Sequence, residues 1–158
     1  MQLVTYSPEE TQEVGMRLGS CAERGDIYLL TGELGAGKTC LTQGIAWGLG
    51  VKGYARSPSF VISTRYKGRL TLYHTDLYRI ADSEEAWDLG LEEDLMGDGV
   101  SIVEWADRAP EIFPPGSLWT KLEYGNEPSQ RVIRFEEPNE RYQQVLRSLG
   151  AGFSIQME

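Results

Sequence analysis

The chain has few of the residues on which several classes of protein depend. Its 158 residues include two cysteines and one histidine. Cys21 and Cys40 do not form a C-x-x-C pair, so we expect neither a zinc site nor a disulfide framework. No apolar run approaches the ~20 residues of a transmembrane helix, and the first ten residues lack the basic region and apolar core of a signal peptide. We therefore expect a reduced, cytoplasmic protein without membrane contact.

Positive charge is also scarce. The chain has four lysines, and its formal net charge is −9. Sequence-independent binding of nucleic acid relies on clustered lysine and arginine, so the composition argues against such binding by this chain alone. If RNA takes part in the function, we expect a partner to hold most of it. Acidic proteins often dock on basic partner surfaces, although composition alone identifies no partner.

A glycine-rich run, GELGAGKT, occupies residues 32–39 and fits the Walker A pattern G-x-x-x-x-G-K-[ST] at every fixed position. The glycines allow successive backbone N–H groups to curl around phosphate oxygens. Lys38 would add a positive charge for the β- and γ-phosphates. Thr39 would offer a hydroxyl to Mg²⁺ at the start of a helix, whose N-terminus favours anions. The alternative is a glycine-rich turn with a solvated lysine.

The residues around this run have the pattern that the motif requires. Residues 27–30 are apolar and β-favouring, which predicts a strand before the loop. Leu41, Ile45 and Leu49 are spaced four apart, as in a buried helix, and Gly50 is a natural stop for it. We expect Cys40 to pack on this helix as a small apolar residue.

The rest of the chain predicts further helices and strands. Ser7 can cap a helix over about residues 7–23 that buries Val14, Leu18 and Cys21, with Glu10 completing a capping box. The other expected elements are a hairpin over 60–72 with its turn at 67–69, short helical turns over 83–89 and 91–95, a buried strand over 100–103, paired strands over 118–124 and 131–136, and a helix over 138–149. They predict a single α/β domain over residues 1–158, with 150–158 as a loose tail. Its expected architecture is a three-layer sandwich of P-loop NTPase type around a mixed, largely parallel central sheet.

A P-loop enzyme also needs a second ligand for Mg²⁺ and a group that orients the attacking water. Glu104 follows the apolar run 100–103, where a carboxylate at a strand end can face the metal directly or through water. The alternative is an ordinary exposed glutamate at a strand end. The simplest interpretation of Trp105 is plain packing.

The segment 74–79 holds the only histidine together with a carboxylate, a phenol and a guanidinium. Alternation along an extended chain would place His74, Asp76 and Tyr78 on one face. Asp76 could then align water or a metal-bound water, and Arg79 could pair with an acid or a phosphate. Equally, His74 could be structural and Arg79 a surface ion pair, and the residues alone leave both interpretations open.

The loop S-P-S-F at residues 57–60 lies where P-loop proteins carry switch segments, and Ser59 is the candidate hydroxyl. A serine beside a proline is also common in plain turns. Residues 94–97 match the D-x-x-G of GTPases but precede the apolar strand, and residues 120–123 resemble a guanine-reading box with glutamate where aspartate is needed. Neither predicts a convincing guanine site.

Taken together, the motifs G-x-L-G-A-G-K-T, S-P-[ST]-[FY], H-x-D-x-Y-R and E-W, in this order from about Thr11 to Trp105, resemble the TsaE (YjeE) family of small bacterial ATPases. The resemblance implies Mg²⁺-dependent hydrolysis of ATP together with TsaB and TsaD. It also implies a part in forming threonylcarbamoyladenosine at position 37 of tRNAs reading ANN codons, with tRNA reached through the complex. The C-terminal third is poorly matched.

By this resemblance Lys38 and Thr39 hold phosphate and Mg²⁺, Glu104 serves the metal and Asp76 takes part in hydrolysis. Ser59 replaces the threonine that the family usually has in the switch-like loop. Motif and resemblance together give the expected ATP-binding residues Thr11, Gly32, Gly35, Ala36, Gly37, Lys38, Thr39, Cys40, Ser59 and Arg131, with Thr11 near the nucleotide and Arg131 near the base. The expected catalytic residues are Lys38, Asp76 and Glu104, and the expected metal ligands are Thr39 and Glu104.

Two other functions remain open at this stage. P-loop kinases of small molecules or nucleosides share the same opening motif, although the arginines here are scattered and form no arginine-rich lid. A nucleotide-regulated binding module with negligible catalysis would also need the loop. A phosphorylated acceptor would indicate the kinase, and background turnover in every context would indicate the binding module.

Overall fold

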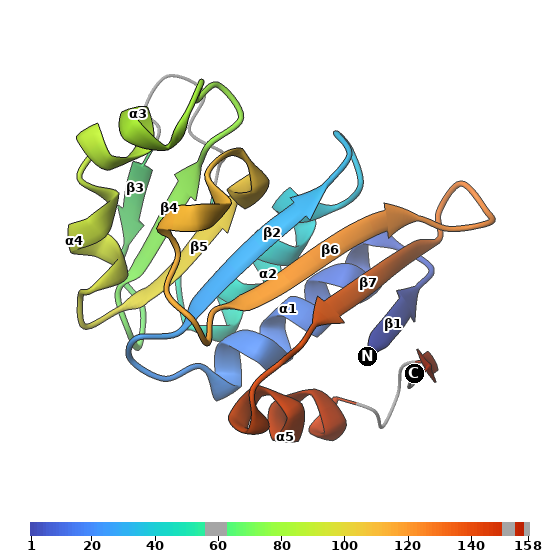
Figure 1. Cartoon of the computed structure of the whole chain (residues 1–158). Coiled ribbons are helices and arrows are strands. Elements are labelled where there is room, and N and C mark those ends of the chain that lie inside the picture. The colour runs from blue at the N-terminus through green and yellow to red at the C-terminus, as the bar shows by residue number, and fades with distance from the viewer. Residues whose placement is uncertain (56–62, 150–153, 157–158) are drawn as a thin grey trace.

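The computed structural model describes residues 1–55, 63–149 and 154–156. Within them eight strands form one sheet, in the order β3-β4-β5-β2-β6-β7-β1-β8 (Figure 1). The strands are β1 (Gln2–Thr5), β2 (Ile27–Gly32), β3 (Ser63–Tyr66), β4 (Leu72–Asp76), β5 (Val100–Glu104), β6 (Leu118–Tyr124), β7 (Arg131–Glu136) and β8 (Ser154–Gln156). Neighbours β4, β5, β2 and β6 run parallel, and the outer pairs are antiparallel. The expected mixed α/β sheet is therefore confirmed, with its parallel part at the centre.

Helices cover both faces of this sheet. The helices α1 (Pro8–Cys21), α2 (Lys38–Gly48) and α5 (Glu140–Ser148) pack on one face. The short helices α3 (Ser83–Asp88) and α4 (Leu91–Leu95), with 3₁₀ turns at Ala106–Arg108 and Pro110–Ile112, cover part of the other face. Two apolar cores result, and β2 supplies both: Tyr28 and Leu30 face the first, Ile27 and Leu29 the second. This alternation is the period of an extended strand buried on both sides.

The packing of α1 on α2 fixes the helix that follows the glycine-rich loop. Gly15 and Gly19 of α1 face Gly44 and Gly48 of α2, and the backbones come so close that a Cβ at Gly44 would lie 2.1 Å from the carbonyl oxygen of Gln12. Only glycine fits at such a distance, so these helices are held by direct backbone contact. The position of α2 then determines where the loop can present its N–H groups.

Some local expectations were wrong. Cys21 is exposed, because the buried stripe of α1 continues through Ala22 at helical spacing from Leu18. Glu10 accepts a hydrogen bond from the N–H of Tyr6, and not from that of the capping residue Ser7. The N-terminal strand β1 was not expected at all. Residues 154–156, expected in a loose tail, form β8 beside β1.

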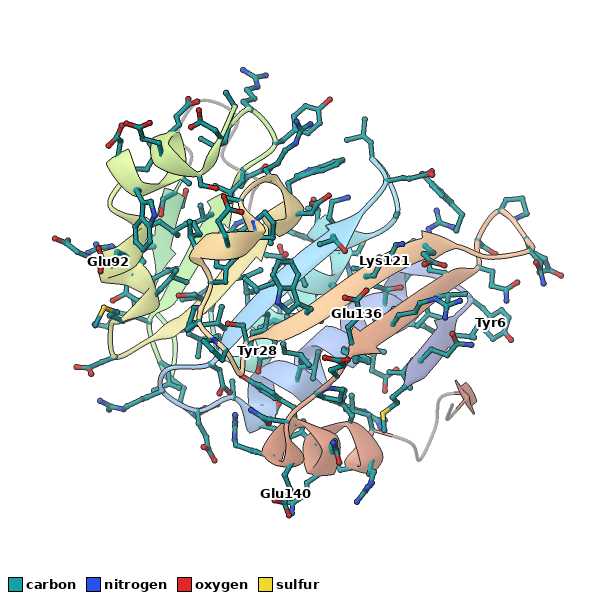
Figure 2. The ribbon with its side chains drawn as sticks, in the orientation of Figure 1. Tyr6, Tyr28, Glu92, Lys121, Glu136 and Glu140 are labelled. Atoms are coloured by element: carbon teal, nitrogen blue, oxygen red, sulfur yellow. The ribbon has the colours of Figure 1, made fainter. Side chains whose placement is uncertain are left out.

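The open part of the sheet lies over β6, β7 and β1, where no helix of the described residues covers the face turned toward the viewer (Figure 2). Lys121 of β6 and Glu136 of β7 are exposed there. In the residues that the structure describes, no helix combines the length and apolar composition that crossing a bilayer requires.

Candidate functional site

The glycine-rich loop connects the end of β2 to the first residue of α2. Gly32 has φ +130 and a Cβ there would lie 2.2 Å from the carbonyl oxygen of Leu122, so no side chain is tolerated. Gly37 caps α2 with φ +112, a backbone conformation that favours glycine. The loop thus brings the N–H groups at the start of α2 to the carboxyl edge of the parallel strands, where open α/β sheets bind ligands.

Lys38 is held inside this loop. Its ammonium donates hydrogen bonds to the carbonyl oxygens of Gly32 at 2.6 Å and Glu33 at 2.8 Å. It also lies 4.0 Å from the centre of the Trp105 ring. Burial lowers the pKa of the Lys38 ammonium, and the nearby carboxylates, with Glu104 the strongest, oppose that shift. The simple interpretation of Trp105 as packing is therefore incomplete, since its ring contacts the loop lysine.

Glu104 ends β5 next to the loop and is 2% exposed, which excludes the alternative of a solvated strand end. The Thr39 hydroxyl donates to its Oε1 at 3.3 Å. Its Oε2 lies 2.5 Å from Nε2 of the fully buried His74. A carboxylate can only accept, so Nε2 carries the hydrogen when Glu104 is ionised. Among the described residues, no group bonds the other ring nitrogen, Nδ1.

Asp76 ends β4 directly opposite Glu104 in the parallel register. Its Oδ1 accepts a hydrogen bond from the N–H of Tyr78 at 2.9 Å, so the chain turns after Asp76. The expectation that His74, Asp76 and Tyr78 alternate along one extended strand was therefore wrong at Tyr78. Burial raises the pKa of the Asp76 carboxyl; the Tyr78 N–H opposes this shift and Glu104 adds to it.

These groups line one hollow of ≈ 320 Å³ beside the loop. Its walls are formed by Leu34, Gly35, Gly37, Lys38, Thr39, Cys40, Asp76, Tyr78, Glu104 and Trp105. The three expected catalytic residues, the expected metal ligands and three further expected nucleotide-binding residues, Gly35, Gly37 and Cys40, are thus brought together. Carboxylates, an ammonium and a hydroxyl at the start of a helix are the chemistry that phosphoryl transfer requires.

Other expected residues lie outside the walls of this hollow. Ala36 is fully buried in the first core, and Gly32 lines a second hollow that shares Trp105 with the first. Thr11 is buried, and its hydroxyl shares a 2.7 Å hydrogen bond with that of Thr5. Its methyl group does lie against the loop, 3.8 Å from where a Cβ of Gly37 would be. The Ser59 prediction falls outside the described residues.

Arg131 approaches the loop through a tyrosine that the sequence did not single out. Its guanidinium lies 4.5 Å from the ring centre of Tyr124, whose hydroxyl donates to the carbonyl oxygen of Leu34 at 2.7 Å. Tyr124 therefore ties the tip of the loop to the end of β6. Sequence reasoning missed Tyr124 because nothing near it in the chain marks it as a neighbour of residue 34.

The oxygen donors of the hollow fit Mg²⁺. Among the described residues, no three or more His, Cys, Asp or Glu side chains form a group that could hold a metal ion by themselves. Magnesium sites commonly use one or two carboxylates, with substrate phosphates and water as the other ligands. Thr39 and Glu104 present a hydroxyl and a carboxylate oxygen 3.3 Å apart in this hollow. They suit an ion that arrives with a nucleotide.

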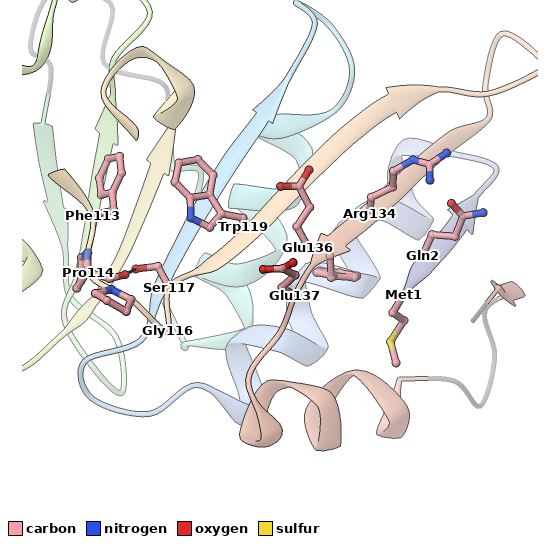
Figure 3. A pocket seen from close by; sticks show the side chains of 12 residues that line it. Met1, Gln2, Phe113, Pro114, Gly116, Ser117, Trp119, Arg134, Glu136 and Glu137 are labelled. Atoms are coloured by element: carbon pink, nitrogen blue, oxygen red, sulfur yellow. Dashed lines mark hydrogen bonds between the residues drawn. The ribbon is translucent and has the colours of Figure 1, made fainter. Parts of the chain in front are cut away.

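A wider hollow of ≈ 770 Å³ lies elsewhere, on the open face of β6 and β7 near the N-terminus. Figure 3 shows Phe113, Trp119, Arg134 and Glu136 around it. None of the residues that converge beside the loop contributes to its walls. The smaller hollow is therefore the candidate active site, because it holds the chemical groups.

Known proteins match the chain over most of its length. The family model described as "Threonylcarbamoyl adenosine biosynthesis protein TsaE" matches residues 5–133. The chain is 41% identical to the tRNA threonylcarbamoyladenosine biosynthesis protein TsaE of Treponema pallidum over 77% of this chain and 90% of that protein. It is 40% identical to the protein of the same name from Bacillus subtilis, over 92% of this chain and 90% of that protein.

The fold is also that of a solved relative. The crystal structure of Bacillus subtilis YdiB superposes with a TM-score of 0.78 at 36% identity, covering 96% of this chain and 94% of that one. The family model spans the glycine-rich loop and both carboxylates that end β4 and β5. Sequence and fold thus agree on one assignment, and the chain belongs to the TsaE family.

Proposed function

We propose that this protein is a Mg²⁺-dependent ATPase that acts with TsaB and TsaD in forming the threonylcarbamoyl group on adenosine 37 of tRNAs reading ANN codons. Family membership supports the pathway, since the relatives carry tRNA threonylcarbamoyladenosine biosynthesis in their names. The observation that carries the ATPase proposal is the convergence of Lys38, Thr39, Asp76 and Glu104 on one hollow beside a glycine-rich loop.

The loop and Lys38 hold the triphosphate in this proposal. The N–H groups at the start of α2 surround phosphate oxygens, and the Lys38 ammonium turns from the carbonyl groups of Gly32 and Glu33 to the β- and γ-phosphates. Mg²⁺, held by Thr39 and Glu104, would neutralise charge on the phosphate oxygens. His74 keeps the Glu104 carboxylate in place through its Nε2–H.

Asp76 orients the attacking water. The water oxygen forms a bond to the γ-phosphorus, while the bond from that phosphorus to the bridging oxygen breaks and its electron pair stays on ADP. One water hydrogen remains on the inorganic phosphate, and the other leaves as a proton by way of the Asp76 carboxylate. Because burial raises the pKa of Asp76, it is a better proton acceptor than an exposed aspartate.

The partners in this proposal come from the resemblance to the TsaE family. A net charge of −9 gives this chain little means of holding tRNA by itself, so TsaB and TsaD supply the nucleic-acid surface in the proposal. ATP turnover is then slow for the chain alone and faster within the assembly. Adenine is favoured over guanine mainly by the resemblance to the TsaE family, and the lack of a convincing guanine-reading motif supports it.

The test is ATP turnover by the purified chain, alone and with TsaB, TsaD and tRNA, with threonylcarbamoyladenosine measured in the same samples. We expect stimulation by the partners and loss of both activities in Lys38→Ala. If Lys38→Ala keeps ATP binding and tRNA modification, the proposal is wrong. A phosphorylated small molecule in place of free phosphate would indicate a kinase, and background turnover in every mixture would indicate a nucleotide-regulated binding module.

A further inference from the structure

We infer that Arg108 is a second cation of the active site, which stabilises the γ-phosphoryl group while it is transferred. The inference rests on the proposed ATPase function and adds a residue that none of the sequence motifs includes. Arg108 ends the 3₁₀ turn Ala106–Arg108, four residues after the carboxylate that ends β5. Between them Trp105 has a positive φ of 58, which turns the chain sharply at the edge of the hollow.

Two aromatic rings place Arg108 at this edge. Its guanidinium carbon lies 5.7 Å from the ring centre of Tyr78 and 6.0 Å from that of Trp105. The two rings are themselves in contact, with centres 4.8 Å apart, and both line the hollow. Of the arginines in the described part of the chain, only Arg108 contacts rings that line it.

Arg108 is also close to the loop lysine. Lys38 Nζ lies 4.0 Å from the same Trp105 ring centre. The distances from Lys38 Nζ and from the Arg108 guanidinium carbon to the centre of the Trp105 ring set an upper limit of about 10 Å between these two atoms. They would be that far apart only on opposite sides of the ring. An arginine side chain that releases its ring contacts can cross part of that gap. A phosphate held by Lys38 is then within reach of a second positive charge.

The charge of Arg108 has no carboxylate partner among the described residues. No hydrogen bond or ion pair of its guanidinium occurs there, whereas Arg65 pairs with Asp94 and Arg141 with Asp26. Ring contacts hold a guanidinium more weakly than a buried carboxylate does, so the group can move to an anion at small cost. It is an exposed residue, and no packing in the core depends on it.

The chemistry of the hollow calls for such a group. Its walls carry the acids Asp76 and Glu104 and one ammonium, Lys38. During transfer, negative charge spreads over the oxygens of the γ-phosphoryl group as the bond to the bridging oxygen breaks. A guanidinium can donate two parallel hydrogen bonds to those oxygens, which a single ammonium cannot. Arg108 would act on the transition state more than on bound ATP.

The test compares Arg108→Ala and Arg108→Lys with Arg24→Ala. Arg24 is an exposed arginine just before the first residue of β2, at the end of that strand away from the glycine-rich loop. We expect Arg108→Ala to lower kcat about 100-fold with KM within about threefold of wild type, and Arg108→Lys to recover part of the loss. Arg24→Ala keeps wild-type kcat. A kcat of Arg108→Ala within about threefold of wild type overturns the inference.

A second measurement does not depend on turnover. ADP with aluminium fluoride mimics the transferring phosphoryl group, so wild type should bind it more tightly than ADP alone, and Arg108→Ala should lose that difference while binding ADP normally. An equal preference in both proteins, or none in wild type, overturns the inference. Absence of ATP turnover in wild type under every condition would count against the proposed function instead, and the binding measurement would still decide the role of Arg108.

Discussion

Nε2 of His74 lies 2.5 Å from Oε2 of Glu104, and both side chains are shielded from solvent. The pair joins the parallel strands β4 and β5, and Glu104 lines the hollow. The other carboxylate oxygen accepts a hydrogen bond from the Thr39 hydroxyl, so one histidine fixes the orientation of the group that meets the start of α2. His74 is fully buried and contacts this carboxylate, so under the proposed function it is a positioning residue.

Replacing His74 by alanine should lower ATP turnover by about 10- to 100-fold, the range for residues that orient a metal ligand. His74→Gln should recover part of the loss, because its amide can donate to Glu104 from nearly the same place. Turnover measured over a series of Mg²⁺ concentrations checks the mechanism, since a misplaced carboxylate should raise the Mg²⁺ requirement. Equal Mg²⁺ dependence in both variants and wild type would contradict this role.

Asp76→Asn should make the protein more stable at neutral pH while removing hydrolysis. Burial raises the pKa of Asp76 in the folded chain, so the folded state binds the proton more tightly than the unfolded state. The protonated Asp76 therefore contributes its whole stabilisation below about pH 3.9, the pKa of aspartate in the unfolded chain. That stabilisation is lost as the pH rises through the higher pKa that Asp76 has in the folded chain. Asparagine cannot ionise and avoids that loss.

The measurement for Asp76→Asn is Tm against pH. The variant should exceed wild type at pH 7, and the difference should shrink toward pH 3, where both side chains are neutral. The exposed Asp88→Asn serves as the control and should show a smaller gain at pH 7. A lower Tm than wild type at pH 7 would mean that the carboxylate makes a stabilising contact that outweighs its burial.

Patterns local in the chain predicted the structure of the glycine-rich loop and its surroundings. The glycines, the lysine and the flanking strand and helix of residues 27–49 depend on neighbours in sequence, and the structure has them as expected. Glu104 was correctly expected to end a buried strand for the same reason. Neither β1 nor β8 could be found in this way, because each is only three or four residues long and is held by pairing with distant segments.

Contacts between distant segments depend on the order of strands in the sheet, which no local pattern contains. The pairing of His74 with Glu104 requires β4 to lie beside β5, and the contact of Trp105 with Lys38 requires β5 to lie beside β2. Tyr124 meets Leu34 across 90 positions of sequence for a similar reason. The sequence therefore singled out the two acids that lie beside the loop, but not the contacts that hold them there.

Removing the Tyr124 hydroxyl should loosen the tip of the loop. That hydroxyl donates to the carbonyl oxygen of Leu34 at 2.7 Å, and a hydrogen bond of this kind contributes about 0.5–1.5 kcal/mol. Tyr124→Phe should therefore weaken binding of an ATP analogue by roughly 2- to 13-fold, measured by titration calorimetry. Tyr54→Phe, at a tyrosine 72% exposed, should bind as wild type does. Equal affinity in all three proteins would mean that the loop keeps its shape without this bond.

Gly44→Ala should destabilise the whole domain, because α1 and α2 touch through their backbones. A Cβ at Gly44 would lie 2.1 Å from the Gln12 carbonyl oxygen, which no rotation of a side chain can relieve. The helices must separate, and overpacking of this kind costs about 1–3 kcal/mol of the free energy of unfolding. Ser20→Ala, on the exposed side of α1, should change it by less than about 0.5 kcal/mol. Urea denaturation measures the free energy of unfolding of both variants. Because α2 begins at Lys38, the shift of α2 in Gly44→Ala should also weaken nucleotide binding in the fraction that stays folded.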